Sequence, residues 1–123
     1  AADTLYSERS RVFENLGIAY LRMGNIDAAR ENLERSLRLN IRQPRALLEL
    51  AQIEFAEGNF VPAWNHYRRF DQLSEQNAAS LWLGVRLARR FEDHSKAASY
   101  ALQLKRLYPN SPEARALVES EKS

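Results

Sequence analysis

The chain has 123 residues, of which 45% are hydrophobic and 28% are charged, a composition typical of one globular domain. The formal net charge of +2 is too small to indicate a nucleic-acid-binding protein by itself. The absence of cysteine excludes disulfides and thiolate metal sites. No apolar run reaches the length of about 18 residues that a membrane-spanning helix needs.

The first part of the chain predicts two helices joined by a tight turn. Residues 7–23 and 26–39 carry the apolar periodicity of helices. Gly24 followed by Asn25 is typical of a helix end and the N-cap of the next helix. Gly17 lies inside the first helix, where glycine costs about 1 kcal/mol relative to alanine. We therefore expect the second helix to approach the first closely at Gly17.

A second helical pair follows. One helix is expected to begin near Pro44, since proline suits the first turn, and to end before Gly58. Asn59 is the expected N-cap of the next helix, and Pro62 falls within its first turn, where the missing N–H does no harm. The pattern of helix, glycine turn and helix therefore repeats.

The last part of the chain predicts a third pair and one more helix. The pair is expected over residues 78–91 and 94–107, with Asp93 as the N-cap of its second helix. Ser111 is the expected N-cap of a seventh helix, with Pro112 as its first residue. This helix is expected to cover the apolar face of the helix at 94–107.

A period of 34 residues relates the three pairs. A glycine-asparagine step opens the turns at 24–26 and 58–60, and alanine recurs at Ala29, Ala63 and Ala97. This period resembles the tetratricopeptide repeat, a helix-turn-helix unit. The residues that carry the resemblance are Phe13, Leu16, Gly17, Tyr20, Ala29, Leu33 and Pro109.

The resemblance implies an all-α fold class, a tetratricopeptide-repeat solenoid of three helix-turn-helix units plus a C-terminal capping helix. We expect one domain over residues 1–123, with units at about 10–43, 44–77 and 78–110 and the capping helix at about 111–121. The third unit departs from the pattern. Glu92 replaces the turn glycine, and the small residue of the close contact is either replaced by Val85 or shifted to Gly84.

Stacked repeats of this kind build a binding surface from the first helices of the units. The fifth, ninth and twelfth positions of each unit are expected to face it, and contiguous exposed apolar surface usually marks an interaction site. The alternative is that the apolar members pack against neighbouring helices. Glu14 holds the first of these positions. The expected partner-binding residues at the others are Ile18, Leu21, Leu48, Gln52, Phe55, Trp82, Arg86 and Arg89.

The sequence contains no pattern typical of catalysis or cofactor binding. His66 and His94 lie far apart and lack a patterned second ligand, so a metal site is not expected. No phosphate-binding loop or nucleophile motif is present. Cytosolic chaperone-binding members of the repeat superfamily hold a carboxylate with Lys and Asn at groove positions, where this chain has Glu14 and Ile18. We therefore predict a non-enzymatic protein without metal or cofactor, and not a cytosolic co-chaperone.

A more specific resemblance is carried by the blocks WLGVRLARRFED (82–93), AASYALQL (97–104) and KRLYP (105–109), with DTLYSERSRVFENLGIA near the start. They are similar to the C-terminal half of the type IV pilus biogenesis lipoproteins of the PilF/PilW type. These proteins are pilotins on the periplasmic side of the outer membrane, where they help secretin subunits arrive and multimerise. The resemblance implies a protein partner, the type IV pilus secretin. It implies membrane attachment only through an N-terminal lipid anchor that this chain lacks.

Two other functions stay open at this point. A general repeat adaptor that binds another protein or peptide would show the same helical pattern. Nucleic-acid binding is disfavoured, because basic residues alternate with acidic ones along the chain and no base-reading pattern recurs.

Overall fold

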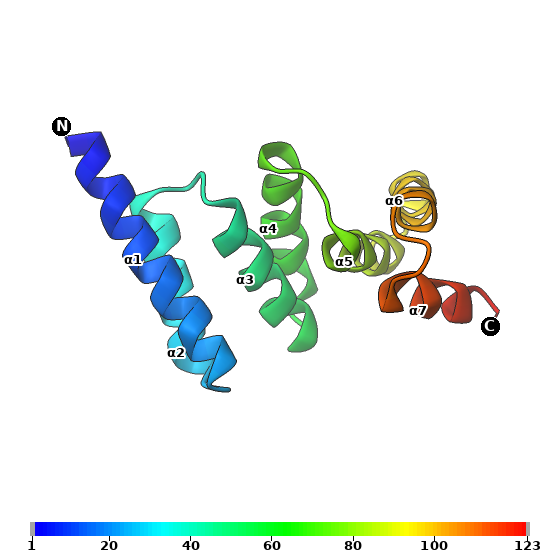
Figure 1. Cartoon of the computed structure of the whole chain (residues 1–123), viewed down its shortest axis with the longest axis horizontal. Coiled ribbons are helices and arrows are strands. Elements are labelled where there is room, and N and C mark those ends of the chain that lie inside the picture. The colour runs from blue at the N-terminus through cyan, green and yellow to red at the C-terminus, as the bar shows by residue number, and fades with distance from the viewer. Residues whose placement is uncertain (1, 123) are drawn as a thin grey trace. The chain divides into compact units, whose positions relative to one another are not determined.

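The computed structural model describes residues 2–122, with side chains from residue 4 onward, and this part is all-helical without a strand. The chain divides into two compact units, Ala1–Ser74 (unit 1) and Glu75–Ser123 (unit 2), and each is described by itself. The predicted all-α fold class is confirmed. The described helices, labelled in Figure 1, are α1 (Ala2–Arg22), α2 (Ile26–Leu39), α3 (Pro44–Ala56), α4 (Phe60–Leu73), α5 (Ala78–Arg90), α6 (His94–Leu107) and α7 (Pro112–Glu121).

Most helix ends lie where local chemistry predicts them. The side chains of Asn25, Asp93 and Ser111 accept backbone hydrogen bonds at the N-termini of α2, α6 and α7, at 3.2, 3.1 and 3.0 Å. Asn59 holds the N-cap position of α4 without a side-chain cap bond. Helix α1 begins at Ala2 rather than near Ser7, because no glycine or proline in between interrupts the backbone.

The turns inside the three helical hairpins (α1–α2, α3–α4 and α5–α6) each contain a residue with a positive φ angle. Gly24 and Gly58 have φ angles of +80° and +81°, and Glu92 has a φ of +57° at the equivalent place in the third hairpin. This left-handed region suits glycine, whereas a residue with a Cβ meets its own carbonyl there. The two glycines confirm the predicted turn register. Glu92 carries a backbone strain that they avoid.

Replacing Glu92 with glycine should therefore stabilise the protein. We expect Glu92→Gly to raise the free energy of unfolding by about 1 kcal/mol, measured by urea denaturation. The control Glu92→Ala keeps the strained backbone while removing the carboxylate, so it should give less than half of that gain. Equal gains from both variants would attribute the effect to the charge rather than to the φ angle.

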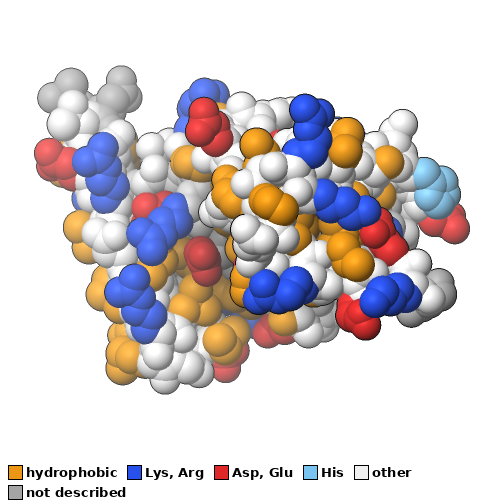
Figure 2. All heavy atoms as spheres, turned by 45° about the vertical axis from the view of Figure 1, so that its right-hand side comes forward, with side chains coloured by type: hydrophobic (Ala, Val, Ile, Leu, Met, Phe, Trp, Pro, Cys, Tyr) orange, Lys and Arg blue, Asp and Glu red, His pale blue; other side chains and the backbone are white. Residues whose placement is uncertain are grey.

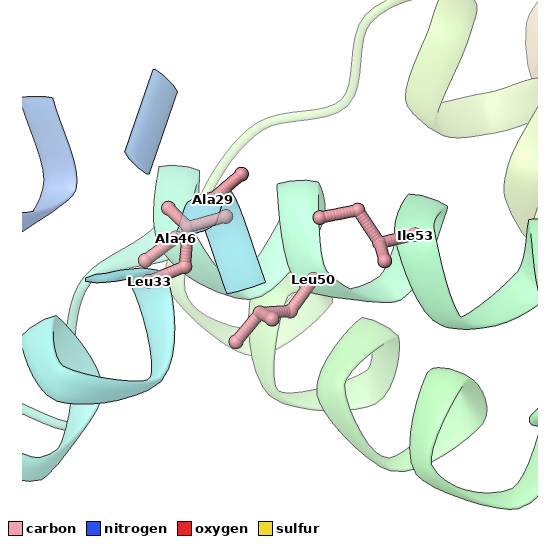
Figure 3. Close-up of a cluster of buried hydrophobic side chains, with 5 residues drawn as sticks. All are labelled: Ala29, Leu33, Ala46, Leu50 and Ile53. Atoms are coloured by element: carbon pink, nitrogen blue, oxygen red, sulfur yellow. The ribbon is translucent and has the colours of Figure 1, made fainter. Parts of the chain in front are cut away.

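Close approach of two helices forms the core of unit 1. A Cβ built on Gly17 in α1 would lie 2.6 Å from Cγ of Leu33 in α2, so α2 occupies the space that a side chain would need. Leu33 and Ala29 are fully buried, whereas the repeat signature residue Leu16 is 42% exposed and does not fill the contact. Figure 3 shows the cluster that α2 and α3 form together, which consists of Ala29, Leu33, Ala46, Leu50 and Ile53.

A buried polar pair reinforces the same contact. The Ser10 hydroxyl donates to the carbonyl oxygen of Ser36 at 2.9 Å, and the Ser36 hydroxyl donates to the carbonyl oxygen of Ser10 at 2.8 Å. Both serines are fully buried, and the Gln43 amide donates to the Ser10 hydroxyl at 2.9 Å. Small side chains that bond each other's backbone allow α1 and α2 to stay close without leaving a polar group unsatisfied.

Adding a methyl group at Gly17 should expose this constraint. Gly17→Ala should lower the free energy of unfolding by about 1–3 kcal/mol, because the new Cβ collides with the fully buried Leu33. Leu33→Ala removes the side chain that the new methyl group would meet. In a double-mutant cycle, the double variant should therefore lose less free energy of unfolding than the sum of the losses in the two single variants. Strict additivity would show that the helices separate freely at Gly17.

Unit 2 packs α7 onto both members of the third hairpin. The Arg89 guanidinium of α5 donates to the Ser120 hydroxyl at 2.9 Å, and Lys105 of α6 pairs with Glu121 at 2.7 Å. The expected capping helix thus contacts α5 as well as α6. Val85 and Gly84 are both buried in α5. The single-domain organisation and the boundaries of the three repeats stay predictions.

Candidate functional site

The predicted binding residues lie on three helices, and their i, i+4, i+7 spacing places them on one face of each helix. We name these faces the α1 face (Ile18 and Leu21), the α3 face (Leu48, Gln52 and Phe55) and the α5 face (Trp82, Arg86 and Arg89). The first two belong to unit 1 and the third to unit 2.

The α1 face is turned largely into the core of unit 1. Ile18 is only 9% exposed, and Leu21 packs against the buried cluster of α2 and α3. Ile18 therefore offers little free area to a partner, whereas Leu21 keeps intermediate exposure. Their role in binding stays a prediction.

Glu14, which holds the first groove position of the first repeat, has a structural contact. Its carboxylate accepts a hydrogen bond from the backbone N–H of Ala46 at 3.1 Å. That N–H belongs to the first turn of α3, where the N-cap residue Gln43 makes no side-chain cap bond. A carboxylate at a helix N-terminus satisfies a free donor and meets the positive end of the helix dipole. Glu14 thus caps α3 from a different helix.

The α3 face is half-buried. Leu48, Gln52 and Phe55 all have intermediate exposure, so each retains surface that a partner can cover. The Phe55 ring packs edge-on against Phe60 at the start of α4, with ring centroids 5.3 Å apart. Burial raises the pKa of the adjacent Glu49, and the nearby charge of Arg45 only partly opposes this. The face is a mainly apolar surface.

The α5 face combines one aromatic ring with two cations. The guanidinium carbons of Arg86 and Arg89 lie 5.0 and 6.0 Å from the Trp82 ring centroid, within range of a cation–π attraction. Arg86 Nε also donates to the Trp82 carbonyl at 3.4 Å. Burial lowers the pKa of Arg86. Trp82 keeps intermediate exposure, so the face presents an indole flanked by positive charge.

The two histidines of the described region have different surroundings. Among residues 2–122, no group of three or more His, Cys, Asp or Glu is placed to hold a metal ion. His94 is exposed at the start of α6, whereas His66 contacts the carboxylate of Glu54 at 2.6 Å. Sequence reasoning missed this pair, because its members lie on separate helices. None of the described helices is long and apolar enough to cross a membrane.

Comparisons with known proteins agree with this geometry. A family model described as tetratricopeptide repeat matches residues 15–70. Over 111 residues, which are 90% of its length, the chain is 57% identical to the type IV pilus assembly protein PilF of Pseudomonas aeruginosa. The aligned region covers 44% of that protein. The fold of this family is typical of non-enzymatic scaffolds.

Two solved structures extend the likeness to three dimensions. One, from a functional characterization of Pseudomonas aeruginosa PilF, has a TM-score of 0.91 and 53% identity over 96% of this chain and 53% of that one. The other is PilW, a widely conserved type IV pilus biogenesis factor, with a TM-score of 0.68 and 26% identity over 86% of this chain and 49% of that one. The chain spans about half the length of each of these relatives.

Removing the Glu14 carboxylate should weaken the fold. We expect Glu14→Ala to lower the free energy of unfolding by about 1 kcal/mol, because the Ala46 N–H loses its acceptor. Glu14→Gln keeps an oxygen acceptor and should lose less. Urea melts of both variants measure this. A Glu14→Ala protein as stable as the parent would contradict the capping role of Glu14.

Proposed function

We propose that the chain is a non-enzymatic protein-binding module of type IV pilus assembly, because a tetratricopeptide-repeat family model matches residues 15–70 and most of the chain is related to PilF. The observation that carries the proposal is the 57% identity over 90% of the chain. Sequence agreement of this extent reaches surface residues as well as the core, whereas a shared repeat fold alone keeps only the core pattern.

The more specific proposal is a pilotin function. In it, the chain is part of a lipoprotein on the periplasmic side of the outer membrane, and its partner is the type IV pilus secretin. Supporting this is the relation to PilF and PilW, whose names place those proteins in pilus assembly and biogenesis.

The α3 face and the α5 face are the proposed contact surfaces. Partly exposed aromatic residues beside arginine have the composition of interface hot spots. Trp82 combines both features, since Arg86 and Arg89 lie against its ring. In this proposal the apolar side chains supply most of the affinity, and the arginines speed the approach of an acidic partner.

The central test is truncation of Trp82. Trp82→Ala should weaken binding of the chain to the purified periplasmic part of the secretin by about 2 kcal/mol, measured by isothermal titration calorimetry. Tyr6→Ala removes an aromatic residue that is 47% exposed on α1 and serves as the control, with no expected change. Circular dichroism melts come first, because a folding defect in Trp82→Ala would identify the indole as core instead.

Charge reversal at Arg86 tests the other half of the proposal. Arg86→Glu should reduce the association rate and weaken its dependence on salt, with much less change in the dissociation rate. Stopped-flow measurements across ionic strengths provide the readout. If Trp82→Ala, Phe55→Ala and Leu48→Ala all fold and bind like the parent chain, the proposed faces are wrong.

A further inference from the structure

Unit 1 has a balanced charge that is unevenly distributed. Residues 1–74 contain ten arginines, no lysine and ten acidic residues, so the unit has no net charge to attract anions in general. Figure 2 shows cationic, acidic and apolar side chains interspersed on one face of the molecule. Any anion preference of unit 1 must therefore come from a local arrangement of its arginines.

Such an arrangement surrounds Arg69 on α4. Three neighbouring surface hollows share this residue, and the one that Arg38 of α2 also lines has a volume of about 340 Å³. A fourth hollow shares Arg38 with it. We call the three hollows that meet at Arg69 the arginine groove. Its lining consists of Glu34, Leu37, Arg38, Ile41, Arg42, Leu50, Asn65, His66, Arg68, Arg69, Gln72 and Leu73.

The cations of the groove are not neutralised within the fold. Arg38, Arg42 and Arg69 are exposed, and in the described part of the chain none of them forms an ion pair. Arg30 on the same unit behaves differently, since Asp27 and Glu57 both pair with it. The single carboxylate in the lining is Glu34. The groove thus carries an unbalanced positive charge within a neutral unit.

Between these arginines the lining is aliphatic. Ile41 is 55% exposed, although it sits in the short connection between α2 and α3. Leu37 and Leu73 are half-buried beside it. An apolar strip flanked by guanidinium groups matches a ligand that carries carboxylates on both sides of an apolar side chain.

We propose that the arginine groove binds an acidic, extended segment of a partner protein, with carboxylates at Arg38, Arg42 and Arg69 and an apolar side chain over Ile41. Guanidinium groups hold carboxylates through paired hydrogen bonds, for which arginine is better suited than lysine. A hollowed surface admits a peptide, whereas the flat surface of an anionic bilayer reaches only protruding side chains. This site lies in unit 1 alone and does not depend on the pilus proposal.

The test uses a defined probe with the whole 123-residue chain. The probe is a fluorescein-labelled peptide of about twelve residues in which Asp and Glu alternate with Leu, and its control replaces the acids with Asn and Gln. The acidic peptide should show saturable, salt-sensitive binding below about 100 μM by fluorescence anisotropy, and the neutral peptide should not. Absence of saturation with the acidic peptide would overturn the proposal.

A charge-matched pair of variants separates the groove from general electrostatics. Arg38→Gln with Arg69→Gln should weaken peptide binding at least tenfold. Arg11→Gln with Arg22→Gln makes the same change in net charge on the exposed part of α1 and should weaken binding less than twofold. Equal losses of peptide affinity in the two double variants would assign binding to net charge and contradict the groove proposal.

Two further measurements complete the design. Ile41→Asp places a negative charge in the apolar strip and should weaken acidic-peptide binding at least tenfold, while its exposure leaves the fold intact, as circular dichroism would show. Phosphatidylglycerol vesicles serve as the competing anion. Vesicle binding that displaces the peptide and is lost in the Arg38→Gln, Arg69→Gln variant would identify a lipid surface instead and contradict the proposal.

Discussion

Helix α2 lies so close to α1 that a side chain at Gly17 would overlap Leu33, and the rest of unit 1 follows from this spacing. The reciprocal hydrogen bonds of Ser10 and Ser36 hold the same two helices together without exposing a polar group. Because α2 is fixed in this way, α3 can pack on it through small and branched side chains (Figure 3). The first turn of α3 then meets Glu14 of α1, whose carboxylate caps it. The close contact at Gly17 therefore supports the α2–α3 packing, while Pro44 and the Glu14 cap mark the start of α3.

That arrangement gives equivalent repeat positions different tasks. Glu14, Leu48 and Trp82 are separated by one repeat length each, yet Glu14 caps a helix whereas Trp82 holds two arginines against its ring. A side chain committed to the core, such as Ile18, has little area left to bury against a partner. The side chains available for binding a partner therefore differ from repeat to repeat, even though the helical fold repeats.

Sequence reasoning recovers the features that depend on local chemistry. Proline at first turns, glycine at left-handed turns and Asn, Asp or Ser at N-caps act within a few residues, so the helix bounds follow from them. It cannot recover pairings between distant residues. Ser10 meets Ser36 and Glu54 meets His66 because helices pack, and periodicity records only which face is apolar. The same limit explains why Ile18 is buried although its repeat position predicted a binding role.

The two units also hold their arginines differently, which affects what each surface can do. Arg86 and Arg89 lie against the Trp82 ring, so their guanidinium groups are already ordered and lose little side-chain entropy when a partner binds. The exposed Arg38, Arg42 and Arg69 lack such support, and a ligand must order them as it binds. In the proposed complex, this ordering cost offsets part of what the paired guanidinium–carboxylate hydrogen bonds contribute at these three residues. Apolar burial over Ile41 adds to the affinity there.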